Sequence, residues 1–407
     1  MSVFAGTRGV AAGVTQGKRL MVYSENIRSM VSERADHLNS FDALRLLGAM
    51  LVLVGHAYPV GGEAGAPCFA GIPINQFGVM IFFAISGYLI TKSLMADSNL
   101  GRFAVKRALR IMPALVVLVL ITVFVAGPAM TVLSIPAYLA SPQTWLYLTT
   151  AALWPQQHLP GVLVGAPFPF ALNASLWTLP VEVTMYALTP VILWLASRSK
   201  PLLVVLVFGG GALGMWLFGA DLFHLRRLTY VMLYGVRLHE GLQYMPDYAL
   251  GSLFAIYGLQ NLTTTVSRIA MAICAVALLA LTIANPSPPW PLPPWNLILA
   301  TLPICGLTLF LWLSPILYSR LLRRIGDMSY GVYLWGFLVE QMIVQFVGVR
   351  DGMAISLIAT PICLALGFVS WRLIEKPALG LKPSRRDSGK ASAGVMPAPA
   401  RVRPEVS

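Results

Sequence analysis

The sequence predicts an all-α protein that crosses a membrane many times. Of its 407 residues, 57% are hydrophobic and only 11% are charged, whereas soluble domains carry about 25% charged residues. Segments of suitable length for helices that span a hydrocarbon core ~30 Å thick recur along the chain. They lie near residues 42–60, 77–95, 111–127, 174–196, 201–219, 245–259, 267–285, 295–317, 328–348 and 353–373. We therefore expect a polytopic membrane protein with about ten transmembrane helices.

The first apolar segment, within Asn39 to Val60, contains two ionisable residues, Arg45 and His56. Eleven residues make about three helical turns, so both side chains project from nearly the same face, roughly 16 Å apart along the axis. Ionisable groups are costly at membrane depth and usually face a bundle interior or a watery cavity. The alternative is structural: a histidine bonded to a neighbouring helix and an arginine that reaches the headgroups.

The second apolar segment carries Ser86 and Gly87 near its middle. Small residues at such a position let two helices approach closely. A nucleophilic role for Ser86 would need an adjacent base, which the sequence does not show. We therefore interpret the Ser-Gly pair as a packing feature.

The stretch RFAVKRALRIMP, residues 102–113, carries a basic cluster into the third apolar segment. Arg107 and Arg110 are three residues apart and so share one helical face, with Lys106 beside them. Guanidinium groups bind phosphates bidentately, so these three residues are candidates for binding a phosphorylated cytosolic ligand. The alternative is that they only fix the topology.

The stretch NASLWTLPVEVTMYAL, residues 173–188, places Glu182 about two turns into an apolar segment. A buried carboxylate needs a partner from another helix or becomes protonated. Arg45 and His56 are the partners that we expect, and a purely structural Glu–Arg pair is the alternative.

The stretch SYGVYLWGFLVEQ, residues 329–341, is rich in amphipathic side chains. They either line a polar cavity or form an aromatic belt at the membrane surface, and the pattern alone leaves both open. The residues concerned are Tyr330, Tyr333, Trp335 and Glu340.

The distribution of basic residues predicts the orientation. If the N-terminus is cytoplasmic, the short loops on that side carry eleven Lys and Arg residues, against four on the other side. Positive residues concentrate in cytoplasmic loops, so we expect both termini in the cytoplasm. Residues 1–38 then form a cytoplasmic tail, 39–377 the transmembrane domain, and 378–407 a disordered basic cytoplasmic tail. The segment 143–154 is too short to span and should lie at the interface or re-enter.

The remaining composition points away from other classes of protein. The formal net charge is +13, but the basic residues are spread between apolar spans, so we expect no nucleic-acid partner. The four cysteines form no CxxC pair and have no neighbouring histidine, so we expect neither a metal site nor a disulfide framework. They are Cys68, Cys274, Cys305 and Cys363.

Taken in order, these motifs resemble the membrane-bound acyltransferase family 3, the O-acyltransferases that modify bacterial polysaccharides and related glycans. The resemblance covers about Asn39 to Pro377 and is specific because several modest motifs follow one another. They are Arg45-x10-His56, FFAISGYLI (82–90), RFAVKRALRIMP (102–113), SLWTLPVEVTMY (175–186), SYGVYLW (329–335) and LIEKP (373–377). Many members have a histidine after the tryptophan of SYxxYLW, where this chain has Gly336.

The resemblance implies ten transmembrane helices, a cytosolic acyl-CoA donor and a glycan hydroxyl as acceptor. It implies an essential histidine at His56, with Arg45, Glu182 and the Arg107/Arg110 pair at other functional positions. We expect transfer of an acetyl group from acetyl-CoA to a polysaccharide such as lipopolysaccharide or exopolysaccharide, or to its lipid-linked precursor, in the bacterial inner membrane.

In this interpretation His56 acts as general base or carries the acyl group transiently. Arg45 stabilises the developing oxyanion or holds a donor phosphate, and Glu182 orients one of the two. The alternative function is a proton-coupled transporter or flippase for a glycan lipid, with His56 and Glu182 as a proton relay. Transporters often betray internal repeats, and no convincing repeat is present in the sequence.

Overall fold

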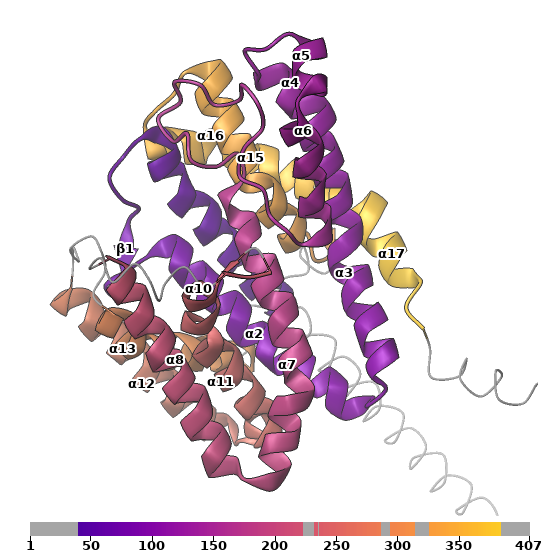
Figure 1. Cartoon of the computed structure of the whole chain (residues 1–407). Helices are drawn as coiled ribbons and strands as arrows, with labels where there is room; N and C mark the ends of the chain where they lie inside the picture. The colour runs from indigo at the N-terminus through magenta and orange to yellow at the C-terminus, as the bar shows by residue number, and fades with distance from the viewer. Residues whose placement is uncertain (1–39, 223–231, 235, 286–293, 314–324, 384–407) are drawn as a thin grey trace, which may run out of the picture.

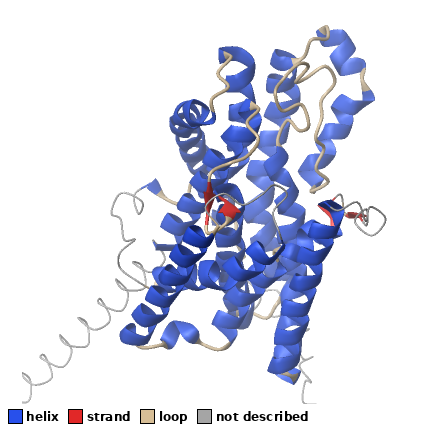
Figure 2. Cartoon of the chain, turned by 90° about the vertical axis from the view of Figure 1, so that its left-hand side faces the viewer, coloured by secondary structure: helices blue, strands red, loops and turns tan. Residues whose placement is uncertain are grey.

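The protein is a bundle of helices, as the computed structural model in Figure 1 shows. The described residues are 40–222, 232–234, 236–285, 294–313 and 325–383. The predicted tail 1–38 and most of the predicted tail 378–407 lie outside them, so their order and location stay predictions. Strands are limited in these residues to two antiparallel pairs of two-residue strands: β1 (Cys68–Phe69) with β2 (Ile72–Pro73), and β3 (Met232–Leu233) with β4 (Val236–Arg237). The predicted all-α class is confirmed (Figure 2).

Seven of the described helices are long and apolar enough to cross a membrane. They are Ser40–Gly61, α2 (Ile74–Ala96), Leu100–Met130, Ala174–Arg198, α12 (Thr264–Ala284), α15 (Ser329–Val347) and Gly352–Gly380. Three of these are composite. Leu100–Met130 consists of α3 (Leu100–Ile121), a π-helical turn and α4 (Gly127–Met130). Ala174–Arg198 consists of a 3₁₀ turn (Ala174–Trp177) and α7 (Thr178–Arg198). Gly352–Gly380 consists of α16 (Gly352–Ser370), a π-helical turn (Trp371–Glu375) and α17 (Lys376–Gly380).

Three more predicted spans fall on α8 (Lys200–Leu222), α11 (Met245–Ile256) and α13 (Pro294–Trp312). Helix α11 has 12 residues, about 18 Å at ~1.5 Å per residue, which is too short to cross a bilayer alone. It begins beside the middle of its neighbours, because Pro246 meets Gly211 of α8 and Cys305 of α13 donates to the Asp247 carboxylate at 3.1 Å. The count of ten complete spans therefore stays a prediction.

Helix α11 packs tightly against α2, where the sequence places the Ser86-Gly87 pair. A methyl group on Gly87 would overlap the backbone carbonyl of Tyr248, and one on Gly251 would overlap the carbonyl of Ala84. The hydroxyl of Ser252 also donates to the Gly87 carbonyl at 3.3 Å. The predicted packing role of this small-residue pair is confirmed.

The loop 128–173 folds over the end of α4 and contains only short helices. These are α5 (Ile135–Ala140), α6 (Pro142–Leu146) and a 3₁₀ turn, Tyr147–Ala152. The segment 143–154 is thus too short to span, as expected. Another short helix, α10 (Leu238–Gln243), packs against α8.

Candidate functional site

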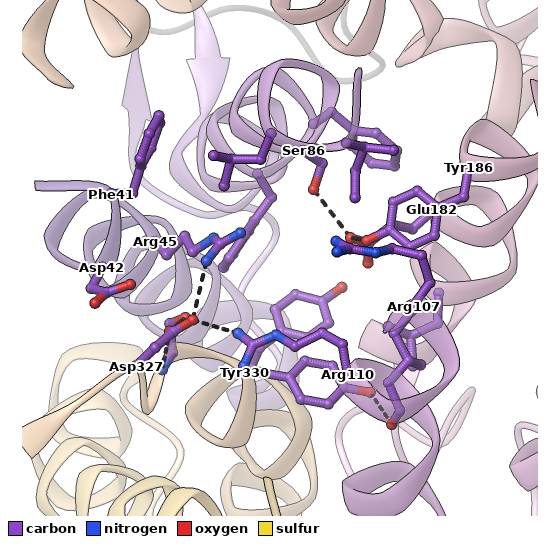
Figure 3. A pocket seen from close by; sticks show the side chains of 18 of the residues that line it. Phe41, Asp42, Arg45, Ser86, Arg107, Arg110, Glu182, Tyr186, Asp327 and Tyr330 are labelled. Atoms are coloured by element: carbon purple, nitrogen blue, oxygen red, sulfur yellow. Dashed lines mark hydrogen bonds and ion pairs between the residues drawn. The ribbon is translucent and has the colours of Figure 1, made fainter. Parts of the chain in front are cut away.

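A cavity of about 560 Å³ lies between the first helix, α2, α3, α7, α15 and the chain after α16. Figure 3 shows three arginine side chains, Arg45, Arg107 and Arg110, entering it from two different helices. Predicted residues from four separate motifs therefore meet here, since Glu182 and Tyr330 line the same cavity. The inner part of the wall is apolar and aromatic, formed by Val79, Phe82, Phe83, Leu179 and Tyr333.

Asp327 joins two of the arginines. Its Oδ2 accepts from Arg45 Nη1 at 3.1 Å and from Arg110 Nη2 at 2.5 Å (Figure 3). Its other oxygen, Oδ1, accepts from the hydroxyl of Ser329 at 2.5 Å. Arg110 also donates from Nη1 to Glu375 Oε2 at 3.3 Å. Because opposite ends of the chain supply these groups, the network ties the first helix, α3 and the C-terminal helices into one frame.

The Asp327 carboxyl precedes the first turn of α15 and is 7% exposed. Burial alone favours its neutral form, but the positive charges of Arg110 and Arg45 and the hydrogen bonds from Ser329 outweigh burial. The pKa of Asp327 therefore lies below its ordinary value, and the residue remains a carboxylate that can hold both guanidinium groups.

Arg107 differs from the other two arginines of the cavity. It forms no ion pair with any described residue, and its buried Nε has no hydrogen-bond partner among them. Its guanidinium carbon lies 5.9 Å from the centroid of the Phe103 ring. A buried donor without an acceptor is costly, so the described residues leave hydrogen-bonding capacity of Arg107 unused.

A further cation stands at the rim of the cavity, after the last helix. Lys382 lines the cavity, and burial, followed by the positive charges of Arg107 and Arg110, lowers its pKa. Lys382 therefore adds a fourth cationic side chain to the three arginines that line the cavity.

Glu182 lies across the cavity from Asp327. It accepts hydrogen bonds from the hydroxyl of Ser86 at 3.1 Å and from the hydroxyl of Tyr186 one turn further along α7 (Figure 3). The expected pairing of Glu182 with Arg45 or His56 is wrong, because Arg45 is held by Asp327 and Glu182 faces α2. Ser86 therefore has a polar contact in addition to its packing role.

His56 is not among the residues that line the cavity. Its Nδ1 lies 3.4 Å from the hydroxyl of Ser175, and its ring meets the Phe337 ring edge-on with centroids 5.2 Å apart. The shared helical face of Arg45 and His56 thus serves two environments: Arg45 points into the cavity, and His56 lies about three turns deeper, beyond the cavity's inner wall.

Lys106 occupies a different surface from Arg107 and Arg110. It pairs with Asp97 at 3.0 Å, beside Arg102 at 2.7 Å. Hydrogen bonds from Arg102 and Lys106 lower the pKa of Asp97. The structure therefore gathers the two arginines and leaves the lysine in a separate, partly buried cluster. Its predicted ligand-binding role stays a prediction.

The structure supports the cavity interpretation for two residues of the aromatic stretch of α15 and the aromatic belt for none of the four. Tyr330 and Tyr333 line the cavity, whereas Trp335 packs against the hydrophobic core. Glu340 is fully buried, and neither carboxylate oxygen has a hydrogen-bond partner among the described residues. Tyr330 donates to the carbonyl of Ile111 at 2.9 Å and so fixes α15 against α3.

Sequence reasoning missed several residues of the site: Asp42, Ser175, Tyr186, Asp327 and Glu375. Four of them had a usable signal. Asp327 stands two residues before SYGVYLW, and Glu375 lies inside the LIEKP motif, to which no role was given. Asp42 and Tyr186 line the cavity one turn from Arg45 and Glu182, respectively, so the helical period also pointed to them.

Comparison with known proteins identifies the family of the chain. A family model described as an acyltransferase domain matches residues 38–372. The chain is 28% identical over 342 residues to the O-acetyl transferase of Shigella phage Sf6, covering 83% of this chain and 95% of that protein. It is 28% identical over 372 residues to Nodulation protein 10 of Rhizobium leguminosarum bv. viciae, covering 86% and 95%. No solved structure matches. The chain therefore belongs to the membrane-bound acyltransferase family 3 and is a multi-pass membrane acyltransferase.

Proposed function

We propose that this protein transfers an acyl group, in the simplest case acetyl, from acyl-CoA to a hydroxyl of a cell-surface glycan or its lipid-linked precursor. The name of the phage relative, O-acetyl transferase, supports acetyl as the group and oxygen as its acceptor. The proposal places the protein in the bacterial inner membrane with both termini in the cytoplasm. The family match favours this enzyme over the transporter alternative.

The observation that carries the proposal is the unpaired guanidinium of Arg107 beside two arginines already fixed in the same cavity. Coenzyme A carries phosphates, and guanidinium forks bind phosphate oxygens bidentately. Asp327 and Glu375 hold Arg45 and Arg110 in place before the donor binds. Little side-chain entropy then remains to be lost on binding.

The apolar inner part of the cavity suits the rest of the donor. The pantetheine arm is long, flexible and largely uncharged, and Phe82, Leu179 and Tyr333 provide a wall of the matching character. In this arrangement the phosphates stay with the arginines and the thioester points toward His56. A donor in this position connects the two halves of the site.

His56 supplies the chemistry in the proposal. If the Ser175 hydroxyl accepts a hydrogen bond from Nδ1–H, the lone pair of the imidazole is on Nε2. In one route, Nε2 takes the proton of the acceptor hydroxyl while the hydroxyl oxygen attacks the thioester carbon. In the other, Nε2 itself attacks the thioester carbon and then transfers the acyl group to the acceptor hydroxyl. In both routes the carbon–sulfur bond breaks and free CoA leaves.

The acceptor enters from the opposite side in this proposal, where the loop 128–173 presents aromatic side chains. Trp145 and Trp154 are 50% and 46% exposed and offer flat faces on which a sugar can stack. The ordinary alternative is an interfacial aromatic belt. Trp290 and Trp295 are further candidates for this role and lie where the structure describes no side chains.

The test is donor binding to the purified full chain, measured as the Kd for radiolabelled acetyl-CoA, followed by label transfer to a glycan extract. Arg107→Ala should raise the Kd at least about tenfold, since a hydrogen bond to a charged group contributes about 1.5–3 kcal/mol. Arg102→Ala is the matched control, because Arg102 lies on the same helix but pairs with Asp97. Equal Kd values for the two variants would refute the assignment of the donor cavity.

A further inference from the structure

Tyr333 of α15 forms part of the inner wall of the cavity, beside Phe82 and Leu179. Its hydroxyl donates to the backbone carbonyl of Ser175 at 2.7 Å and shares a hydrogen bond of 2.5 Å with the Thr178 hydroxyl. Its ring meets Phe82 of α2 edge-on, with centroids 5.6 Å apart. Tyr333 thus bridges α15, α2 and the start of α7 across the end of the cavity.

His56 lies on the other side of Ser175 from Tyr333. The same Ser175 that accepts the Tyr333 hydrogen bond through its carbonyl has its hydroxyl 3.4 Å from His56 Nδ1. Phe337, one turn along α15 from Tyr333, packs against the imidazole. A single residue, Ser175, therefore separates the cavity wall from the imidazole, although His56 itself does not line the cavity.

We infer that Tyr333 is the gate between the donor cavity and His56. The inference rests on the proposed function: if the arginines hold the CoA phosphates, the thioester must cross this wall for its acyl carbon to meet the imidazole. Among the wall residues Tyr333 is suited to move: it closes the gap with a ring that turns about two side-chain torsions. Ser175, in contrast, forms part of the 3₁₀ turn before α7. Tyr333 is a positioning residue in this scheme and takes no part in bond making.

Access to position 56 can be measured without acyl transfer. The full chain, with its four cysteines replaced by serine, receives one reporter cysteine through His56→Cys or Ser86→Cys. Vesicles are treated with an anionic, membrane-impermeant methanethiosulfonate on the face from which Ser86→Cys reacts. Ser86 lines the cavity, so this reporter defines the donor side without assuming the topology.

Tyr333→Ala should raise the labelling rate of His56→Cys at least about tenfold, because it removes the ring and both hydrogen bonds that close the wall. Tyr333→Phe keeps the ring and should give a smaller increase. Neither change should alter labelling of Ser86→Cys. Tyr330→Phe is the matched control: Tyr330 lines the same cavity but bonds to Ile111, so its loss should leave both rates unchanged.

A third reporter, Ser175→Cys, lies behind the same ring and differs from the native residue by one atom. It replaces His56→Cys if that variant does not accumulate. Where Tyr333→Ala does not accumulate, Tyr333→Phe carries the test. The gate is overturned if position 56 reacts equally fast with and without the Tyr333 ring. The gate is also overturned if Tyr333→Ala raises the labelling rate of Ser86→Cys as much as that of His56→Cys, since that result means a general rearrangement. Loss of acetyl-CoA binding by Arg107→Ala is a separate result and bears only on the proposed function.

Discussion

Asp327 controls the charge balance of the cavity at the scale of single residues. One of its oxygens accepts from both Arg45 and Arg110, and only Glu375 provides Arg110 with a second described carboxylate. Removing one partner of a buried ion pair leaves the others uncompensated. Arg45 and Arg110 repel each other, and the negative charge of Asp327 offsets this repulsion. A phosphate group bound beside them would offset it in the same way.

We expect Asp327→Asn to lower the melting temperature of the ligand-free protein strongly, because breaking a buried ion pair costs about 3–5 kcal/mol. Saturating CoA should restore a large part of the loss, since its phosphates replace the missing negative charge. Thermal unfolding in detergent with and without CoA measures both effects. Asp97→Asn is the control, because Asp97 pairs with Arg102 and Lys106 outside the cavity and is more exposed than Asp327. Its substitution should therefore change the response to CoA little. A CoA-induced shift no larger than that of the wild type would contradict this account.

His56→Ala should abolish acylation while the protein still inserts and accumulates. Loss of a general base lowers the rate by about 10²–10⁴, and loss of an acyl carrier lowers it further. The donor Kd should remain near its wild-type value, because His56 lies outside the arginine-lined cavity. Label transfer and CoA binding on the same preparation measure the two quantities. Near-wild-type transfer by the alanine variant would remove His56 from the mechanism.

The sequence revealed the site residues that stand out from their surroundings. Arg45, His56 and Glu182 are ionisable groups inside apolar runs, where desolvation is costly unless the group has a polar partner or a functional role. Asp327 and Glu375 lie just outside the apolar runs 328–348 and 353–373, so they do not stand out as charges inside an apolar run. Their partners are 282 and 265 residues away, and no local pattern reports a contact over such a separation.

At the scale of elements, the contact between α2 and α11 sets the position of one wall of the cavity. Ser86 faces the cavity and Gly87, the next residue, faces α11. The sequence correctly predicted a close helix contact at this pair but could not predict its partner. The apolar run 245–259 contains both α11 and the turn after it, so its length alone overstated the helix that crosses the membrane.

Gly87→Val should separate α2 from α11 and destabilise the protein by about 1–3 kcal/mol or more, because the new side chain overlaps the Tyr248 carbonyl. Donor affinity should fall with it, since the wall that carries Ser86 moves. Unfolding in denaturant and CoA binding provide the two measurements. Gly209→Ala is the control: a methyl group at Gly209 of α8 meets no atom within 4 Å, so it should be neutral or stabilising. Equal effects of the two substitutions would show that the α2–α11 contact is not limiting.

At the scale of the whole molecule, the charged groups of the cavity gather at one end of the bundle. Arg45 lies near the start of the first helix, Arg107 and Arg110 near the start of α3, and Lys382 just after the last helix. These chain positions belong to the side that the Lys and Arg distribution assigns to the cytoplasm. A soluble, phosphorylated donor and the positive end of the cavity are then found in the same compartment.

Labelling of single cysteines tests this orientation directly. Ser141 precedes α6 in the loop 128–173, whereas the exposed Ser197 ends α7 on the side of the arginines. In a background without the four native cysteines, Ser141→Cys should react with a membrane-impermeant maleimide added outside spheroplasts. Ser287→Cys, at a position outside the described residues, should behave likewise. Ser197→Cys should react only after permeabilisation, because its loop carries Arg198 and Lys200 and the positive-inside rule retains such loops in the cytoplasm. The reverse pattern would place the arginine-lined end of the cavity outside the cell, away from any acyl-CoA pool, and would overturn the donor assignment together with the orientation.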